Sequence, residues 1–538
     1  MPSRIAAAVL ALALLAVALE LGTSLGRPFL WNDEGETAMY GERVLAFGYP
    51  AVDDGRNVVF ECSCPRDVGA RGNVYVGSTW GQYLLGAMGA AWAHGSADDA
   101  GRTARLRAPF VVAGLLALLL AAGTAAGFFC GRAPALLAAA AVVALCGLSL
   151  PLVLHLRQAR HPAPATLLAV AAVAVHLRRW ILGRGGLGAE LLEALLLVLL
   201  WHTFHPGALL LAAALASERG IDALRRERGW ARLFAALRDT RAVWIAALAL
   251  IPSVLYWRPF EVAAQMRPHV SVTPSVYASH LYQIAIQFLA LRDGLVPSLV
   301  LLAAALWLRR RGALSRDEER RVSAACAIAL VIGAYVALLC AFPFVWQRYV
   351  VELSPLVAIG VVLAGSAVAS AAARPHGRPH GRPAAAVSAL VLGVWGVWAG
   401  PTRLGELAGF ERSLLAPPRG PLDAAVAEIR AAYPDPSRLT IGTTYEVSSL
   451  QWYLGARVSR GPFEAPPDVL IPRRGWPYGL AELQRWNATG GYRQVVLGAA
   501  NWPWNDIPEL RADPRLPLHR WTSPLAGVDG PPLVLFFR

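Results

Sequence analysis

Three carboxylates, Asp33, Glu34 and Glu36, stand within four positions near the start of the chain. They follow an apolar run, 5–25, that is long enough to cross a bilayer. A carboxylate at a membrane surface can take a proton from a hydroxyl nucleophile, which is general-base chemistry. The same spacing also fits a capping box, in which Asp33 caps a helix and Glu36 reaches back to it. Position alone favours neither interpretation.

The composition is that of a membrane protein. The chain has 538 residues, is 56% hydrophobic and 16% charged, and has a mean hydropathy of +0.44. Soluble domains carry about 25% charged residues. All 50 basic residues are arginine, and the net charge of +14 would suggest a nucleic-acid partner in a soluble protein. Arginine in place of lysine, with abundant Ala, Gly and Leu, suggests a GC-rich and most simply bacterial genome. Because the arginines gather in short loops between apolar runs, we predict a membrane protein with no nucleic-acid partner.

Eleven apolar runs predict transmembrane helices. They lie at 5–25, 108–129, 133–154, 163–181, 187–203, 206–217, 242–257, 294–308, 322–341, 350–372 and 385–400. Cytoplasmic loops of membrane proteins are enriched in basic residues. With the N-terminus inside, the short inner segments hold 21 arginines and the short outer loops hold 6. We therefore predict a multi-pass protein of the inner (plasma) membrane with a cytoplasmic N-terminus and with Asp33 outside.

Two long segments lie on the predicted outer side. The loop 26–107 is too long to be a simple connector, and helices are expected over 33–47 and 79–93, the second in the interface plane. In the tail, 401–538, short β-type runs alternate with helical stretches, which predicts a soluble α/β domain. The predicted fold class is an α-helical polytopic domain, 1–400, with about 11 transmembrane helices, followed by this extracytoplasmic domain.

Further polar side chains recur at the outer ends of the predicted spans. Such groups usually line a wet or functional cavity, and arginine forks suit phosphate. The candidates for binding a lipid phosphate or an acceptor are Arg157, Arg160, His161, His202, His205, Arg348 and Tyr349, with Tyr40, Arg43 and Arg258 as secondary candidates. A carboxylate and several arginines at the outer face of a membrane together indicate a reaction in which an acceptor outside the cell attacks a phospholipid-linked donor. For any single arginine, anchoring at the interface explains the position equally well.

At this point the residues resemble a known family. Asp33-Glu34 with Tyr40, Arg43 and Gly48-Tyr49-Pro50 resembles the first outer loop of the GT-C glycosyltransferases, in the branch of the protein O-mannosyltransferases and the lipid A aminoarabinose transferase. The resemblance continues in Ala159-Arg160, His202, His205, Arg348-Tyr349-Val350 with Pro355, and 450–455.

The resemblance implies a GT-C-like fold and an inverting transfer of one sugar from a polyprenyl-phosphate donor. The acceptor would be a hydroxyl-bearing lipid, glycan or protein of the cell envelope. Asp33 would be the catalytic base or bind the acceptor hydroxyl, and Glu34 would assist or orient it. Arg160 and Arg348 would hold the lipid phosphate. No cofactor is firmly implied, no metal ligands are predicted, and a divalent cation is compatible with the assignment.

The chain departs from the family in two places. Relatives carry a Lys-Pro-Pro-Leu-type segment where this chain has 76–83 without lysine, so an arginine must replace that lysine or the lipid binds differently. Cys62 and Cys64 are unfamiliar, and a disulfide between cysteines two apart is strained. Cys62 and Cys64 could be free thiols, a pair of metal ligands or a bridge to another chain. The default interpretation is that they stabilise the structure of the loop.

Two further interpretations concern the rest of the chain. The repeat at 374–383 carries His376 and His380, and a basic anchor against anionic lipid explains it better than a metal site. A polytopic transporter or lipid flippase is the alternative function for the whole chain. Internal repeats and ionisable residues at mid-bilayer are typical of transporters, and the sequence shows neither.

Overall fold

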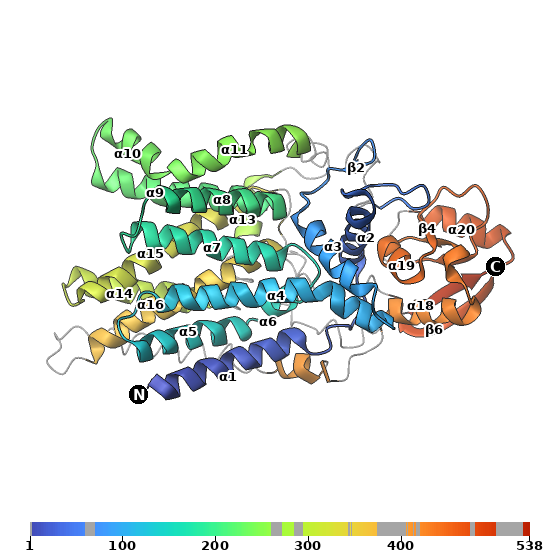
Figure 1. Cartoon of the computed structure of the whole chain (residues 1–538), viewed down its shortest axis with the longest axis horizontal. Coiled ribbons are helices and arrows are strands. Elements are labelled where there is room, and N and C mark those ends of the chain that lie inside the picture. The colour runs from blue at the N-terminus through green and yellow to red at the C-terminus, as the bar shows by residue number, and fades with distance from the viewer. Residues whose placement is uncertain are drawn as a thin grey trace.

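The computed structural model consists of a helical bundle and a smaller C-terminal unit that contains a sheet (Figure 1). It describes residues 3–59, 70–259, 272–284, 294–342, 345, 347–373, 405, 407–412, 414–415, 420–473, 479–501 and 531–538. The N-terminus lies at one end of the long axis, and the C-terminal unit lies at the other (Figure 1). A mostly helical protein with a small C-terminal sheet is the class predicted from the sequence.

Ten of the eleven predicted spans fall on helices, and the eleventh, 385–400, lies outside the described residues. The helices are α1 (Ser3–Gly22), α4 (Asp99–Ala126), α5 (Arg132–Gly147), α6 (Leu150–Leu156), α7 (Pro162–Trp180), α8 (Leu187–Thr203), α9 (His205–Arg226), α11 (Arg241–Trp257), α14 (Leu295–Arg310), α15 (Arg316–Leu339) and α16 (Ser354–Ala372). Shorter helices are α10 (Ala231–Asp239) and α13 (Pro274–Leu281), and two 3-10 turns, η3 (Gln347–Tyr349) and η4 (Val351–Leu353), precede α16.

Several of these helices continue beyond the apolar runs that predicted them. α4 begins at Asp99, nine residues before the predicted start, and the Asp98 side chain caps it by accepting from the backbone N–H of Gly101 at 2.6 Å. The apolar run ends where the membrane would end. The helix itself can continue into water, because its backbone hydrogen bonds and a capping side chain still satisfy the peptide groups there. Hydropathy therefore predicted the centres of the helices better than their ends.

Length and composition support fewer spans than the sequence predicts. Within the described part of the chain, four helices are long and apolar enough to cross a membrane, or up to six if each bent pair forms one span. The bent pairs are α5 with α6, at 83°, and α10 with α11, at 61°. The number eleven stays a prediction.

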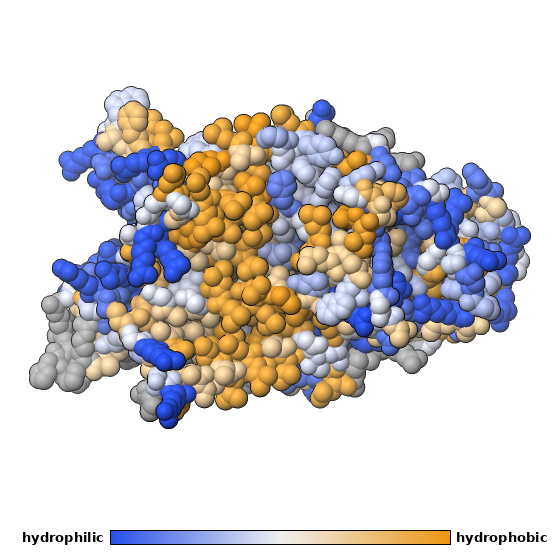
Figure 2. Space-filling view, in the orientation of Figure 1, coloured by the Kyte–Doolittle hydropathy of each residue, from blue (hydrophilic) through white to orange (hydrophobic). Residues whose placement is uncertain are grey.

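On the face shown in Figure 2, an apolar band crosses the bundle between two polar ends. On α1, Leu12, Leu15 and Leu19 are 66%, 57% and 57% exposed. Exposed leucines in this number would be costly in water but are suited to contact with lipid. The bundle is therefore a multi-pass membrane domain.

The segment 26–107, predicted as the first outer loop, lies between the bundle and the C-terminal unit (Figure 1). It contains α2 (Asn32–Phe47), a hairpin of β1 (Ala70–Arg71) and β2 (Val74–Tyr75), and α3 (Gly81–Ala93). α2 and α3 cross at two glycines, and a Cβ on Gly41 would lie 2.8 Å from the carbonyl carbon of Gly86. As predicted, α2 ends at Gly48, which has a φ of 80°.

Of the two interpretations of Asp33 and Glu36, the capping box is not formed in α2. The helix begins at Asn32 after Trp31, and no side chain caps it. The Glu36 carboxylate instead accepts from the Asn32 side-chain amide at 2.9 Å. Asp33 therefore lies inside the first turn and is not the cap. Its carboxylate is available to other parts of the fold.

The C-terminal unit has the predicted α/β character. Its strands are β3 (Thr440–Thr443), β4 (Arg457–Ser459), β5 (Val469–Ile471), β6 (Arg493–Ala500) and β7 (Pro532–Phe537), and its helices are α18 (Pro421–Ala432), α19 (Val447–Leu454) and α20 (Leu480–Thr489). The sheet order is β4-β3-β5-β7-β6, with β3 parallel to both neighbours and β7 antiparallel to both of its own. α19 connects this unit to α2, because the Ser449 hydroxyl donates to the Trp31 carbonyl at 3.1 Å.

Candidate active site

Two arginines from distant parts of the chain meet the Asp33 carboxylate. Arg160, in the loop between α6 and α7, contacts Oδ2 of Asp33 through Nη1. Arg348, in η3, reaches the same oxygen through its own Nη1 at 3.3 Å. The sequence predicted these residues as a set, and the structure brings them together. Two guanidinium groups therefore converge on one carboxylate oxygen.

The cluster is mostly but not fully buried. The side chain of Arg160 is 5% exposed, whereas those of Asp33 and Arg348 are 16% and 17% exposed. The guanidinium of Arg160 also lies over the Trp31 ring, 5.6 Å from its centroid. Low local dielectric strengthens charge interactions inside such a site, and the residual exposure leaves access for a ligand.

An aromatic wall stands beside the two arginines. The His161 ring stacks on Phe204 with a centroid distance of 4.3 Å and an interplanar angle of 16°, and Phe204 lies 5.4 Å from Tyr349. The His161 backbone N–H donates to the Gln82 side-chain oxygen at 3.1 Å, which ties this wall to α3. Burial, together with the nearby guanidinium groups of Arg160 and Arg348, lowers the pKa of His161 well below its usual value. His161 therefore contributes a neutral ring.

Glu34 faces a different partner from its neighbour Asp33. Its carboxylate is fully buried and takes two hydrogen bonds from Arg107 of α4, at 2.8 and 2.6 Å. It also accepts from the backbone N–H of Ala159 at 2.8 Å, one residue before Arg160. Arg107 donates in addition to the carbonyls of Leu25 and Pro28. Glu34 thus connects α2, α4 and the segment that carries Arg160.

Sequence reasoning missed Arg107 and Tyr335. Arg107 lies at the edge of a predicted span, and an arginine at that position is usually interpreted as an anchor at the membrane interface. Tyr335 lies within the apolar run of α15, and its hydroxyl donates to the Tyr349 carbonyl at 3.1 Å and to the Glu352 carboxylate. It thereby holds the turn that carries Arg348. Neither residue has a sequence signal that separates it from core or anchor residues.

Three predicted residues bind partners away from Asp33 instead. Both terminal nitrogens of Arg157 donate to carbonyls at the end of α1, those of Glu20 and Thr23. The Tyr40 hydroxyl donates to the Val59 carbonyl at 2.5 Å. Arg43 pairs with Asp54 at 2.8 Å and donates to the Asn57 carbonyl at 3.1 Å. Tyr40 and Arg43 therefore hold the segment 26–107 in shape, and Arg157 holds the segment that carries it against the end of α1.

The remaining candidates lie around α8, α9 and α11. The His202 ring is 5.5 Å from Trp257, and the His205 ring is 5.7 Å from Trp201. His205 lines a small cavity together with 76–79, part of the segment that stands in place of the relatives' lysine segment. Arg258 is exposed at the end of α11, with a φ of 46°.

The chain is similar to the crystal structure of ArnT from Cupriavidus metallidurans in the apo state, with 14% identity, a TM-score of 0.49, and coverage of 88% of this chain and 86% of that one. For ArnT from the same organism bound to undecaprenyl phosphate, the identity is 14% and the TM-score is 0.49. That comparison covers 100% of this chain and 98% of the other. The oligosaccharyltransferase of Archaeoglobus fulgidus in the apo form is 12% identical, with a TM-score of 0.45. That comparison covers 84% of this chain and 64% of the other.

ArnT, the lipid A aminoarabinose transferase, and the oligosaccharyltransferase are both GT-C superfamily members. No protein-family profile and no curated protein sequence match the chain.

Among the described residues, no three histidine, cysteine, aspartate or glutamate side chains are grouped so that they could hold a metal ion. Cys62, Cys64, His376 and His380 lie outside the described residues, so the predictions made for them stay predictions.

Proposed function

We propose that the chain is a membrane glycosyltransferase that moves one sugar from a polyprenyl-phosphate donor to a hydroxyl-bearing acceptor on the extracytoplasmic side. The observation that carries this proposal is the convergence of Arg160 and Arg348 on Asp33 of α2, the helix that lies between the bundle and the C-terminal unit (Figure 1). Paired guanidinium groups suit a lipid phosphate, and the band suits the polyprenyl chain. The carboxylate supplies the base that a hydroxyl acceptor requires.

In the proposed reaction, the lipid phosphate pairs with Arg160 and Arg348. The acceptor hydroxyl gives its proton to the Asp33 carboxylate while its oxygen forms a bond to the anomeric carbon. The bond from that carbon to the phosphate oxygen breaks, and the electron pair stays on the phosphate. The two guanidinium groups stabilise the charge that develops there. Attack opposite the leaving phosphate inverts the anomeric carbon.

The other predicted residues take supporting roles in this proposal. Glu34, with Arg107, positions Asp33 and Arg160 and does not touch the substrate. His161 and Tyr349 line the wall beside the phosphate. Tyr40 and Arg43 hold the segment 26–107 in shape, Arg157 binds the end of α1, and His202, His205 and Arg258 stay candidates for binding the donor or the acceptor. The protein would span the plasma membrane with its N-terminus cytoplasmic and its C-terminal unit outside.

Mass spectrometry of the cell envelope tests the proposal. Cells without the gene should lack one glycosyl unit on an envelope lipid, glycan or protein, and the wild-type gene should restore it while Asp33→Asn should not. The purified protein should then transfer that sugar from a polyprenyl-phosphate donor. Energy-coupled solute uptake by vesicles containing the protein, with no glycosylated product, would overturn the proposal in favour of a transporter.

A further inference from the structure

The short helix α10 lies at the end of the bundle far from α2 (Figure 1), and it carries an exposed apolar stripe. Trp230, Leu233, Phe234 and Leu237 are 80%, 50%, 68% and 44% exposed. Their spacing of three and four residues places them on one face of the helix. A soluble protein rarely exposes such a contiguous apolar face without a partner.

Arginines flank this stripe. The segment 219–241 contains seven arginines and three acidic residues. The side chains of Arg225 and Arg228 form no ion pair or hydrogen bond with any residue that the structure describes, and the Arg232 side chain donates through Nε to the Glu227 carbonyl at 2.7 Å. Around α10, polar and apolar side chains lie side by side next to the apolar band (Figure 2). Cationic charge is therefore available beside the stripe.

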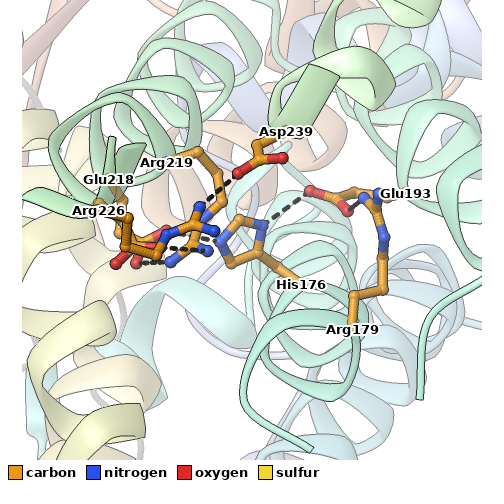
Figure 3. Close-up of polar contacts among 8 residues, drawn as sticks. His176, Arg179, Glu193, Glu218, Arg219, Arg226 and Asp239 are labelled. Atoms are coloured by element: carbon orange, nitrogen blue, oxygen red, sulfur yellow. Dashed lines mark hydrogen bonds and ion pairs between the residues drawn. The ribbon is translucent and has the colours of Figure 1, made fainter. Parts of the chain in front are cut away.

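A buried charge network fixes the position of α10. Asp239, its last residue, is 3% exposed and accepts from Arg226 of α9 at 2.6 Å. The same part of the bundle holds His176, whose ring nitrogens lie 2.9 Å from Glu193 and 3.0 Å from Glu218 (Figure 3). Because these contacts link α7, α8, α9 and α10, the apolar stripe keeps one orientation relative to the bundle.

A groove runs between α9 and α10. Its volume is about 550 Å³, and it is lined by Gly220, Leu224, Trp230, Leu233 and Ala236, with Arg232 beside them. α10 also bends by 61° from α11, which is a predicted span, so its axis departs from the direction of that span. An apolar groove at the edge of the membrane, with arginine beside it, suits a lipid with an acyl chain and an anionic head.

We propose that α10 is an interfacial lipid-binding helix. Its apolar stripe enters the leaflet on the arginine-rich side of the membrane, and Arg225, Arg228 and Arg232 bind the phosphates of anionic phospholipids. An acyl chain occupies the groove between α9 and α10. The charge selects lipid over a second copy of this chain, because a second α10 would bring like charges together. This proposal does not depend on the glycosyltransferase assignment.

Hydrogen exchange of the full-length protein in nanodiscs tests the proposal. Nanodiscs of phosphatidylcholine alone are compared with nanodiscs that also contain phosphatidylglycerol. The amides of 229–239 should exchange more slowly when phosphatidylglycerol is present. Replacing Arg225, Arg228 and Arg232 together by glutamine should abolish that difference, because three lost charges weaken anionic-lipid binding by about a hundredfold. Leu233→Ser with Phe234→Ser should increase exchange in both lipids.

The matched control removes three arginines from another loop on the same side, Arg309, Arg310 and Arg316, and should leave the protection of 229–239 intact. Unchanged exchange in α7 and α8 shows that a variant is folded. Equal exchange of 229–239 with and without phosphatidylglycerol would overturn the proposal. Protection that instead rises with protein concentration in detergent, together with a dimer mass, would overturn it in favour of a second copy.

Discussion

The adjacent carboxylates Asp33 and Glu34 should respond in opposite ways to the loss of their charge. Asp33→Asn and Glu34→Gln each replace one oxygen by an amide nitrogen with little change in shape. Asp33 is partly exposed and faces two arginines, whereas Glu34 is fully buried against Arg107. We expect Asp33→Asn to stop the chemistry in a folded protein and Glu34→Gln to destabilise the fold.

The expected magnitudes follow from these environments. Loss of a general base lowers the rate by about 10² to 10⁴. Breaking a buried ion pair by removing one charge costs about 3 to 5 kcal/mol, because the Arg107 guanidinium is left buried without its counter-charge. The Asp33→Asn change should cost less, about 1 to 3 kcal/mol, because the oxygen of the new side-chain amide would still accept a hydrogen bond from arginines that retain some solvent.

Two measurements separate the outcomes. Transfer from a polyprenyl-phosphate sugar gives kcat for each variant, and thermal unfolding in detergent gives the loss of stability. Asp33→Asn at the wild-type rate would refute the assignment of the base. The positioning role of Glu34 depends on its buried ion pair with Arg107, so its loss should lower stability. A Glu34→Gln protein that is as stable as wild type but inactive would therefore refute that role.

Four further substitutions test other parts of the structure. Arg160→Gln and Arg348→Gln should each lower kcat/KM for the donor by about 10- to 100-fold, from the loss of a charged hydrogen bond, and unchanged kinetics would mean that the phosphate binds elsewhere. Tyr335→Phe removes the hydroxyl that holds the turn of Arg348, so kcat/KM should fall by about 5- to 10-fold with normal expression; an unchanged value would show that the turn holds without it. Glu193→Gln leaves His176 with one carboxylate and should lower the free energy of unfolding by about 3 kcal/mol, measured by thermal unfolding, while activity per folded molecule stays at the wild-type level. Loss of that activity would connect this distant network to the site.

Local sequence signals predicted the helices well and their polar ends poorly. Apolar runs located the centres of the bundle helices, and Gly48 marked the end of α2. The start of α2 was missed because Asp33 and Glu36 have the spacing of a capping box, while the helix begins one residue earlier without one. A capping pattern describes only the hydrogen bonds that a side chain can form with nearby backbone. In this protein the Asp33 carboxylate forms ion pairs with Arg160 and Arg348, which are distant in the sequence.

From the sequence alone, the membrane character, the small C-terminal α/β unit and the set of polar residues at the outer ends of the helices could be predicted, because hydropathy and charge are local properties. Only the tertiary structure decided which residues of that set meet. Arg160 and Arg348 reach Asp33, Arg157 turns to the end of α1, and Glu34 pairs with Arg107. Such pairings join residues far apart along the chain, so they depend on how the helices pack. No local pattern separates an arginine that anchors a helix from one that completes a site.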